Sequence, residues 1–237
     1  MRNLDRADQL KVSAKGLSDF VSDVDRGAEA EIIRTVQRYY PDHAILGEES
    51  GALGDSEWQW VIDPLDGTTN FLHGFPHFAV SIAVLHKGEI EHGVIYAPCT
   101  QDLYTASKGK GALLNNRRLR VSRRRTLSEA LIGTGAPIRN EERNQTYLPM
   151  FEQVISSTAG VRRAGSAALD LAYVAAGRLD GFWELSLQPW DIAAGILMVR
   201  EAGGIVTELD GGDPMATGSV VAGTPKLHPE LLQLLGR

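Results

Sequence analysis

The sequence predicts a layered fold of the α+β or α/β class, and the prediction depends on two patterns along the chain. In the first half, one amphipathic helix precedes short apolar runs separated by tight turns, which is typical of an antiparallel meander packed on a helix. In the second half, strands and helices alternate, which indicates a mixed sheet covered by helices. A length of 237 residues allows a sizeable buried core.

The first half is expected to begin with a helix from Ser22 to Tyr40. Ser22 and Asp25 are spaced like a capping box, and Pro41 ends the helical pattern. Short strands follow, the first of which is terminated by Asp63 and Pro64. The expected strands are 58–62, 78–85, 90–96, 103–105 and 119–121.

The second half is expected to alternate between strands and helices. The strands are 131–134, 181–184, 205–207 and 219–222, and the helices are 145–157, 167–176, 191–202 and 225–235. Gly177 stands at the position typical of a helix C-terminus. The arginine-rich connection Arg117–Arg125 separates an N-terminal half, residues 1–121, from a C-terminal half, residues 122–237, within one compact unit.

Composition excludes several classes of protein. Hydrophobic residues make up 43% and charged residues 23%, which rules out a disordered chain or a coiled-coil rod. The net charge of −6 gives no overall basic field for nucleic acid or acidic membranes. The single cysteine, Cys99, is interpreted as a packed residue, and one cysteine points to a reducing compartment. Without a secretory signal or a long apolar run, the chain is expected to be cytoplasmic with no membrane contact.

Acidic residues beside glycine or proline carry the strongest chemical signal. They lie at Glu48-Glu49, at Asp63 and Asp66, and at Asp191 after a tryptophan. Asp63 ends an expected strand and Asp66 follows three residues later, so a sharp turn can aim both carboxylates at one point. The Leu65 carbonyl lies between them. Oxygen ligands without histidine or cysteine suit Mg²⁺, with Mn²⁺ as the alternative, rather than zinc.

A turn suited to anions follows this acid pair directly. Gly67 lets the backbone approach an anion closely, and the amides after it can point at phosphate oxygens. The pattern therefore predicts a phosphate group held on metal ions. A simpler alternative is that Asp63 and Asp66 are solvated turn residues and that Asp191 is a helix N-cap. The chain has no P-loop, and the spacing of the aspartates differs from that of haloacid-dehalogenase phosphatases, which disfavours a covalent aspartyl-phosphate.

Five segments, in order, closely resemble the signatures of the inositol monophosphatase family, and of its bacterial SuhB-type branch in particular. These segments are 19–25, 47–50, 63–71, 162–170 and 190–195. The resemblance implies an αβαβα sandwich of the inositol monophosphatase and fructose-1,6-bisphosphatase type, and a homodimer. It also implies Mg²⁺-dependent, Li⁺-sensitive hydrolysis of a phosphate monoester such as inositol 1-phosphate.

The resemblance also implies which residues hold two to three metal ions. Glu48, Asp63 and the Leu65 carbonyl would hold the first ion. Asp63, Asp66 and Asp191 would hold the second, and a third, weaker ion would lie near Glu48.

Catalytic and substrate-binding roles follow from the same resemblance. Thr68, oriented by Asp19, would position the attacking water near Glu48, and the amides of Gly67 and Thr68 would bind the phosphate. Arg162 is a further candidate for the substrate end, the alternative being a surface or dimer-interface arginine. The other expected substrate contacts are Leu65, Asp66, Gly165, Ser166, Ala167, Glu184 and Asp191.

The sequence is also compatible with other functions. Relatives use fructose 1,6-bisphosphate, 3′-phosphoadenosine phosphates and histidinol phosphate, although Glu184 and the segment Gly165-Ser166-Ala167 favour an inositol phosphate. The arginines of Arg117–Arg125 offer a contact for RNA or the transcription machinery, in which SuhB-type relatives are implicated; the alternative is a solvated connection. The family also implies a full helix before the segment matching residues 15–25, where this chain has residues 1–14, and a longer segment between Ser50 and Trp58.

Overall fold

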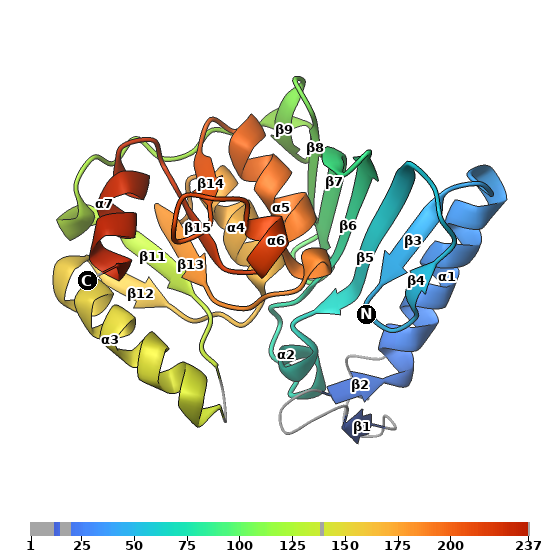
Figure 1. The fold of residues 1–237 in the computed structure, drawn as a ribbon, viewed down its shortest axis with the longest axis horizontal. Coiled ribbons are helices and arrows are strands. Elements are labelled where there is room, and N and C mark those ends of the chain that lie inside the picture. Colours follow the sequence, from blue (N-terminus) through green and yellow to red (C-terminus); the bar gives the residue numbers. More distant parts are fainter. Residues whose placement is uncertain (1–11, 15–19, 138–139, 237) are drawn as a thin grey trace.

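A computed structural model describes residues 12–14, 20–137 and 140–236. The elements stack in five layers (Figure 1): helix α1 (Asp23–Tyr39), an eight-stranded sheet, helices α4 (Ala167–Ala175) and α5 (Pro189–Glu201), a five-stranded sheet, and helices α3 (Glu141–Ser157) and α7 (Leu227–Leu235). The layered αβαβα fold is thereby confirmed.

The large sheet has the order β10-β9-β8-β7-β6-β5-β3-β4. Its strands are β3 (Ala44–Gly47), β4 (Gly51–Leu53), β5 (Trp58–Asp66), β6 (Ala79–His86), β7 (Glu89–Ala97), β8 (Asp102–Ser107), β9 (Gly111–Leu114) and β10 (Arg117–Arg118). Strands β5 to β10 form the expected antiparallel meander, and β3 joins parallel to β5. Lys87 and Gly88, both with positive φ, make the tight β6–β7 turn.

One expected strand boundary and one expected strand in this sheet were wrong. Strand β5 continues to Asp66 instead of ending at Ile62, because its pairing with β6 shifts register between Asp63 and Asp66, and such a bulge accommodates the proline there. The expected strand 119–121 is absent. The chain turns at Asn115 and Asn116, and β10 ends at Arg118.

The small sheet has the order β12-β11-β13-β15-β14. Its strands are β11 (Leu131–Thr134), β12 (Gly160–Arg162), β13 (Gly181–Glu184), β14 (Ile205–Thr207) and β15 (Val220–Gly223). Strand β11 is parallel to both of its neighbours and the other pairs are antiparallel, so the predicted mixed sheet is confirmed. The short elements are β1 (Val12–Ala14), β2 (Phe20–Ser22), α2 (Thr68–Leu72), η2 (Leu127–Glu129) and α6 (Pro214–Thr217).

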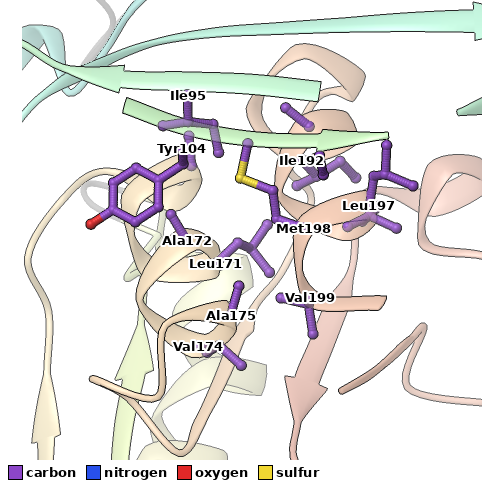
Figure 2. Close-up of a cluster of buried hydrophobic side chains, with 14 of the residues drawn as sticks. Ile95, Tyr104, Leu171, Ala172, Val174, Ala175, Ile192, Leu197, Met198 and Val199 are labelled. Carbon is purple, nitrogen blue, oxygen red and sulfur yellow. The ribbon is translucent and has the colours of Figure 1, made fainter. Parts of the chain in front are cut away.

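The main core surrounds α4 and α5, which lie between the two sheets. Figure 2 shows Met198 of α5 below Ile95 and Tyr104 of the large sheet, and Leu171 of α4 between the two helices. Both helices are apolar on all sides, as expected for helices covered by a sheet on each face. Their N-termini are consequently held rigidly.

Helix starts differ from the expected ones by a few residues. Helix α3 begins at Glu141, four residues before the expected start at 145, because the Asn140 side chain accepts a hydrogen bond from the Arg143 amide and caps the helix. Helix α5 begins at Pro189, two residues before the expected start at 191.

In the described part of the chain, no helix has both the length and the apolar character that a membrane span requires.

Candidate active site

The bulge in β5 places the first two acids. Asp63 is almost fully buried, with 2% of its surface exposed, and its Oδ1 accepts a hydrogen bond of 2.8 Å from the Leu65 amide. This bond folds the backbone back on itself within the bulge. The sequence predicted that Asp63 and Asp66 would approach each other, and the bulge is the feature that brings them together.

Asp66 connects the acid pair to the N-terminus of α4. Its Oδ2 accepts hydrogen bonds from the Ser166 hydroxyl at 2.6 Å and the Ala168 amide at 2.7 Å. The start of a helix carries unsatisfied amides and partial positive charge, so it suits a carboxylate. Three expected substrate contacts, Gly165, Ser166 and Ala167, thus lie beside Asp66, although Ser166 is itself buried.

Asp191 reaches the site from the first turn of α5. It is not the N-cap of this helix, because Gln188 occupies that position and its amide donates to Asp191 Oδ2 at 2.7 Å. This backbone hydrogen bond orients the carboxylate, as in a capping box.

Glu48 lies in the turn between β3 and β4, where its amide donates to the Ile62 carbonyl at 3.1 Å. The next amide, of Glu49, donates to Glu29 Oε2 at 2.9 Å. Glu29 belongs to α1 and is buried, so helix α1 holds the turn that presents Glu48.

Electrostatic coupling shows that these acids face one region. Burial, followed by the charges of neighbouring acids, raises the pKa of Asp63 well above its ordinary 3.8; the neighbours are Asp66, Glu48 and Asp191. Burial, followed by the charge of Asp66, likewise raises the pKa of Asp191. Burial also raises the pKa of Asp66 to about 6, against hydrogen bonds from Ser166 and the α4 amides. Crowded like charges of this kind favour a bound cation.

The donor chemistry fits magnesium. All candidate donors are carboxylate or carbonyl oxygens, which a hard cation prefers. Among the residues that the structure describes, no three acidic, histidine or cysteine side chains stand close enough to enclose an ion on their own. Mg²⁺ does not need such a cage, since it usually takes one or two carboxylates and completes its shell with water and substrate phosphate.

Thr68 follows the acid pair and contacts α1. Its hydroxyl oxygen lies 3.2 Å from Asp25 Oδ1 and 3.1 Å from the Leu65 carbonyl oxygen, so one hydroxyl proton has two acceptors. Asp25 is completely buried. Asp19, which was expected to orient Thr68, lies outside the described residues, and Asp25 is the acid that contacts the hydroxyl.

Gly67 and Asn70 shape the turn that joins the acids to the substrate segment. Gly67 has φ of +96°, and a Cβ there would lie 3.0 Å from the His77 carbonyl oxygen, so a side chain is excluded. The Asn70 amide nitrogen donates to the carbonyls of His77 at 2.7 Å and Ala164 at 2.9 Å. Asn70 thereby ties α2 to the segment that enters α4.

A cavity of about 320 Å³ lies beside this turn. Its lining includes Thr69, Glu184, Arg143 and Arg163. Burial raises the pKa of Glu184 to about 8, with the charge of Asp66 acting in the same direction and Arg163 opposing it. Glu184 is therefore placed beside the acid cluster, and its expected contact with the substrate stays a prediction.

The structure does not bring Arg162 to this cavity. Its guanidinium donates to the Val161 carbonyl, and the residue lines a separate cavity with His77 and Tyr173. Successive residues of an extended chain point to opposite sides, so the neighbouring Arg163 takes the position beside Glu184.

Three residues of the site were missed from the sequence: Asp25, Glu29 and Arg163. A signal existed for the first two, because they continue the helical stripe that includes Ile32 and Val36, and acids on a face destined for burial usually have a partner. No pattern distinguished Arg163 from Arg162.

The fold and the site together define a class: a layered α/β protein with a buried carboxylate cluster beside a tight turn and a polar cavity. Comparison with known proteins specifies the class further. The model of the inositol monophosphatase family matches residues 2–237, and the chain belongs to this family.

Individual relatives extend this result. The chain is 51% identical to the Nus factor SuhB of Pseudomonas aeruginosa over 238 residues, which cover 98% of this chain and 88% of the relative. Its fold matches the crystal structure of the extragenic suppressor protein suhB from Bartonella henselae with a TM-score of 0.97 and 49% identity, covering 100% and 92% of the two chains. An inositol monophosphatase from Anabaena matches with a TM-score of 0.85 and 43% identity, covering 90% and 85%.

Proposed function

We propose that the protein is a Mg²⁺-dependent, Li⁺-sensitive phosphate monoester hydrolase that acts on inositol 1-phosphate. One observation carries the proposal: burial and the charge of Asp66 raise the pKa of both Asp63 and Asp191, beside a threonine that contacts a buried aspartate. Membership of the inositol monophosphatase family supports the same chemistry.

Two to three Mg²⁺ ions would be held by oxygen donors alone. We assign Glu48, Asp63 and the Leu65 carbonyl to one ion, and Asp63, Asp66 and Asp191 to another. The three acids of the second set would have to move closer together as the ion binds, because among the described residues no three acids stand close enough to enclose one. When bound, Mg²⁺ activates water and stabilises the charge that develops on the phosphate.

The chain's own groups orient the reactants. Asp25 accepts the Thr68 hydroxyl proton, which leaves the threonine oxygen free to accept a hydrogen bond from the attacking water near Glu48. The amides of Gly67 and Thr68 donate to the phosphate, and the positive φ of Gly67 supports this turn. Glu184 faces the hydroxyls of the alcohol.

Phosphate release from inositol 1-phosphate tests the proposal. We expect turnover that requires Mg²⁺ and that Li⁺ inhibits. Comparison of kcat/KM with that for fructose 1,6-bisphosphate, a 3′-phosphoadenosine phosphate and histidinol phosphate establishes which ester is preferred. A pure, folded protein that releases phosphate from none of them contradicts the proposal.

The pH dependence of stability reports on the acid cluster. An acid with a higher pKa in the folded chain than in the unfolded chain binds more protons when folded, so the free energy of unfolding falls as pH rises between the two values. For Asp66 this window runs from 3.8 to about 6, and for Glu184 from 4.5 to about 8.

Without divalent cations, we therefore expect these acids to lower the melting temperature as the pH rises from 5 to 8, and Mg²⁺ to restore part of the loss. The Asp66→Asn variant should show a weaker pH dependence than the wild type, whereas Asp55→Asn, at an exposed position, should behave like the wild type. An equal pH dependence in wild type and Asp66→Asn would contradict this prediction.

A second candidate function is contact with RNA or the transcription machinery. Relatives that are 51% identical are named Nus factor SuhB, and the six arginines of 117–125 are exposed here. Arg124 forms an ion pair of 3.2 Å with Asp180, and the other arginines offer a basic surface. Charge reversal of Arg117, Arg123 and Arg125 should abolish binding to RNA or Nus-type partners; binding that survives excludes this surface.

We also propose that the protein forms a homodimer. Light scattering, which measures the molar mass in solution, tests this proposal.

A further inference from the structure

At the cavity, strand β11 is followed by a residue that has no side chain. Gly135 follows Thr134, the last residue of β11, and Thr134 is paired in parallel register with Trp183 of β13. Glu184, the last residue of β13, is therefore the neighbour of Gly135 across the strand ends. Both residues line the same cavity.

The Glu184 carboxylate fills the space that a side chain at position 135 would need. A Cβ built on Gly135 would overlap the Cδ, Oε1 and Oε2 atoms of Glu184. These are the three nearest atoms to that Cβ, so the obstruction comes from this one group. Any residue other than glycine at this position would force Glu184 to move.

Neighbouring charged side chains also act on the Glu184 carboxylate. Arg163 interacts favourably with Glu184 and with Asp170, an α4 residue that is only 2% exposed. Asp170 and Asp66 repel Glu184 electrostatically. The carboxylate thus lies against the backbone of Gly135, with a counter-charge at Arg163.

We propose that Gly135 is a specificity-determining position. Because it has no Cβ, the Glu184 carboxylate can lie against its backbone, where the carboxylate contacts the hydroxyls of a polyol leaving group; we call this position of the carboxylate the seat of Glu184. The inference rests on the proposed function and deepens it. A carboxylate fixed before the substrate arrives makes its hydrogen bonds without reorganisation. The substrate class that this arrangement favours is a phosphate ester whose alcohol carries several hydroxyls, as opposed to an ester of an aryl alcohol.

The neighbouring glycines provide contrasts. A Cβ on Gly133 would lie 2.8 Å from Leu179 Cδ1 and 3.2 Å from Phe182 Cδ2, so an alanine there disturbs the core. A Cβ on Gly160, in β12 of the same sheet, would lie 3.6 Å from its nearest neighbours, which is ordinary contact. Gly160→Ala is therefore the matched control.

The first experiment measures selectivity. For Gly135→Ala, we expect the ratio of kcat/KM for inositol 1-phosphate to that for 4-nitrophenyl phosphate to fall about tenfold or more, the effect of a misplaced charged hydrogen-bonding group. Gly160→Ala should keep the wild-type ratio. A wild-type ratio in Gly135→Ala, including equal losses on both esters, overturns the proposal.

A second set of variants tests the seat itself. Glu184→Asp withdraws the carboxylate by one methylene, so adding Gly135→Ala to it should change the ratio by less than about twofold, since the two positions are coupled. Independent, multiplicative losses overturn the proposal. This comparison also applies if Gly135→Ala alone fails to fold.

Thermal unfolding provides a readout that does not need activity. Gly135→Ala should lower the melting temperature by at least about 3 °C in the wild type, and by clearly less when Glu184 is replaced by alanine. Equal shifts in both backgrounds overturn the proposed seat. Absence of hydrolysis of any ester by the wild type contradicts the proposed function instead, and the thermal comparison then decides whether Gly135 seats Glu184.

Discussion

Replacing Asp63 with asparagine should lower kcat/KM for inositol 1-phosphate by about 10³-fold, while the metal-free variant melts at a higher temperature than the metal-free wild type. Asparagine retains an Oδ1 that accepts from the Leu65 amide, so the local backbone is preserved. It removes a negative charge that burial and three neighbouring acids make unfavourable. The Asp63 carboxylate thus lowers the stability of the metal-free protein, yet the proposed reaction requires it.

Phosphate release and thermal unfolding, each with and without Mg²⁺, measure both parts of this prediction. Mg²⁺ should raise the melting temperature of the wild type more than that of Asp63→Asn, since the variant has lost a ligand assigned to two ions. Asp55→Asn is the matched control at an exposed site. Near-wild-type turnover of Asp63→Asn in saturating Mg²⁺ would remove Asp63 from the proposed ligands.

Substituting Thr68 with alanine or Asp25 with asparagine should each reduce kcat about 10²- to 10³-fold, the range typical of positioned proton-transfer groups. The two side chains lie 3.2 Å apart and act as one unit, so the double variant should be no slower than the worse single variant. KM should change little, because the pair orients water and does not hold the alcohol.

A double-mutant cycle with inositol 1-phosphate measures this coupling. Thr35→Ala is a suitable control, since Thr35 lies on the same helix as Asp25 and its hydroxyl donates to the Glu31 carbonyl of that helix. Losses that multiply in the double variant would show that Thr68 and Asp25 act separately, and that the contact between them serves the fold alone.

The sequence could predict those features that depend on residues close together in the chain. The acid pair and its turn were identified because Asp63, Asp66 and Gly67 lie within one short segment, where spacing limits what the backbone can do. Layering was predictable because apolar periodicity reports which faces are covered. The extension of β5 was not, because the bulge depends on how β6 pairs with it.

Contacts between distant segments escaped prediction for the same physical reason. Asp25 meets Thr68 across 43 positions in the chain, and Glu29 meets the Glu49 amide across 20, so neither contact leaves a local pattern. The choice between Arg162 and Arg163 depends on the phase of β12, a strand of only three residues. One residue of slip in so short a strand exchanges the two cavities that these arginines line.

The enclosure of α4 and α5 between two sheets has an evolutionary consequence. Nearly every residue of these helices is buried, so most substitutions there would lose packing and destabilise the fold. The acids near the starts of the two helices are therefore held in place by a part of the structure that tolerates little sequence change. Divergence toward new alcohols has more room along the lining of the cavity, around residues 136–137 and 185–187. A library confined to these two stretches is the economical route to altered substrate choice in this scaffold.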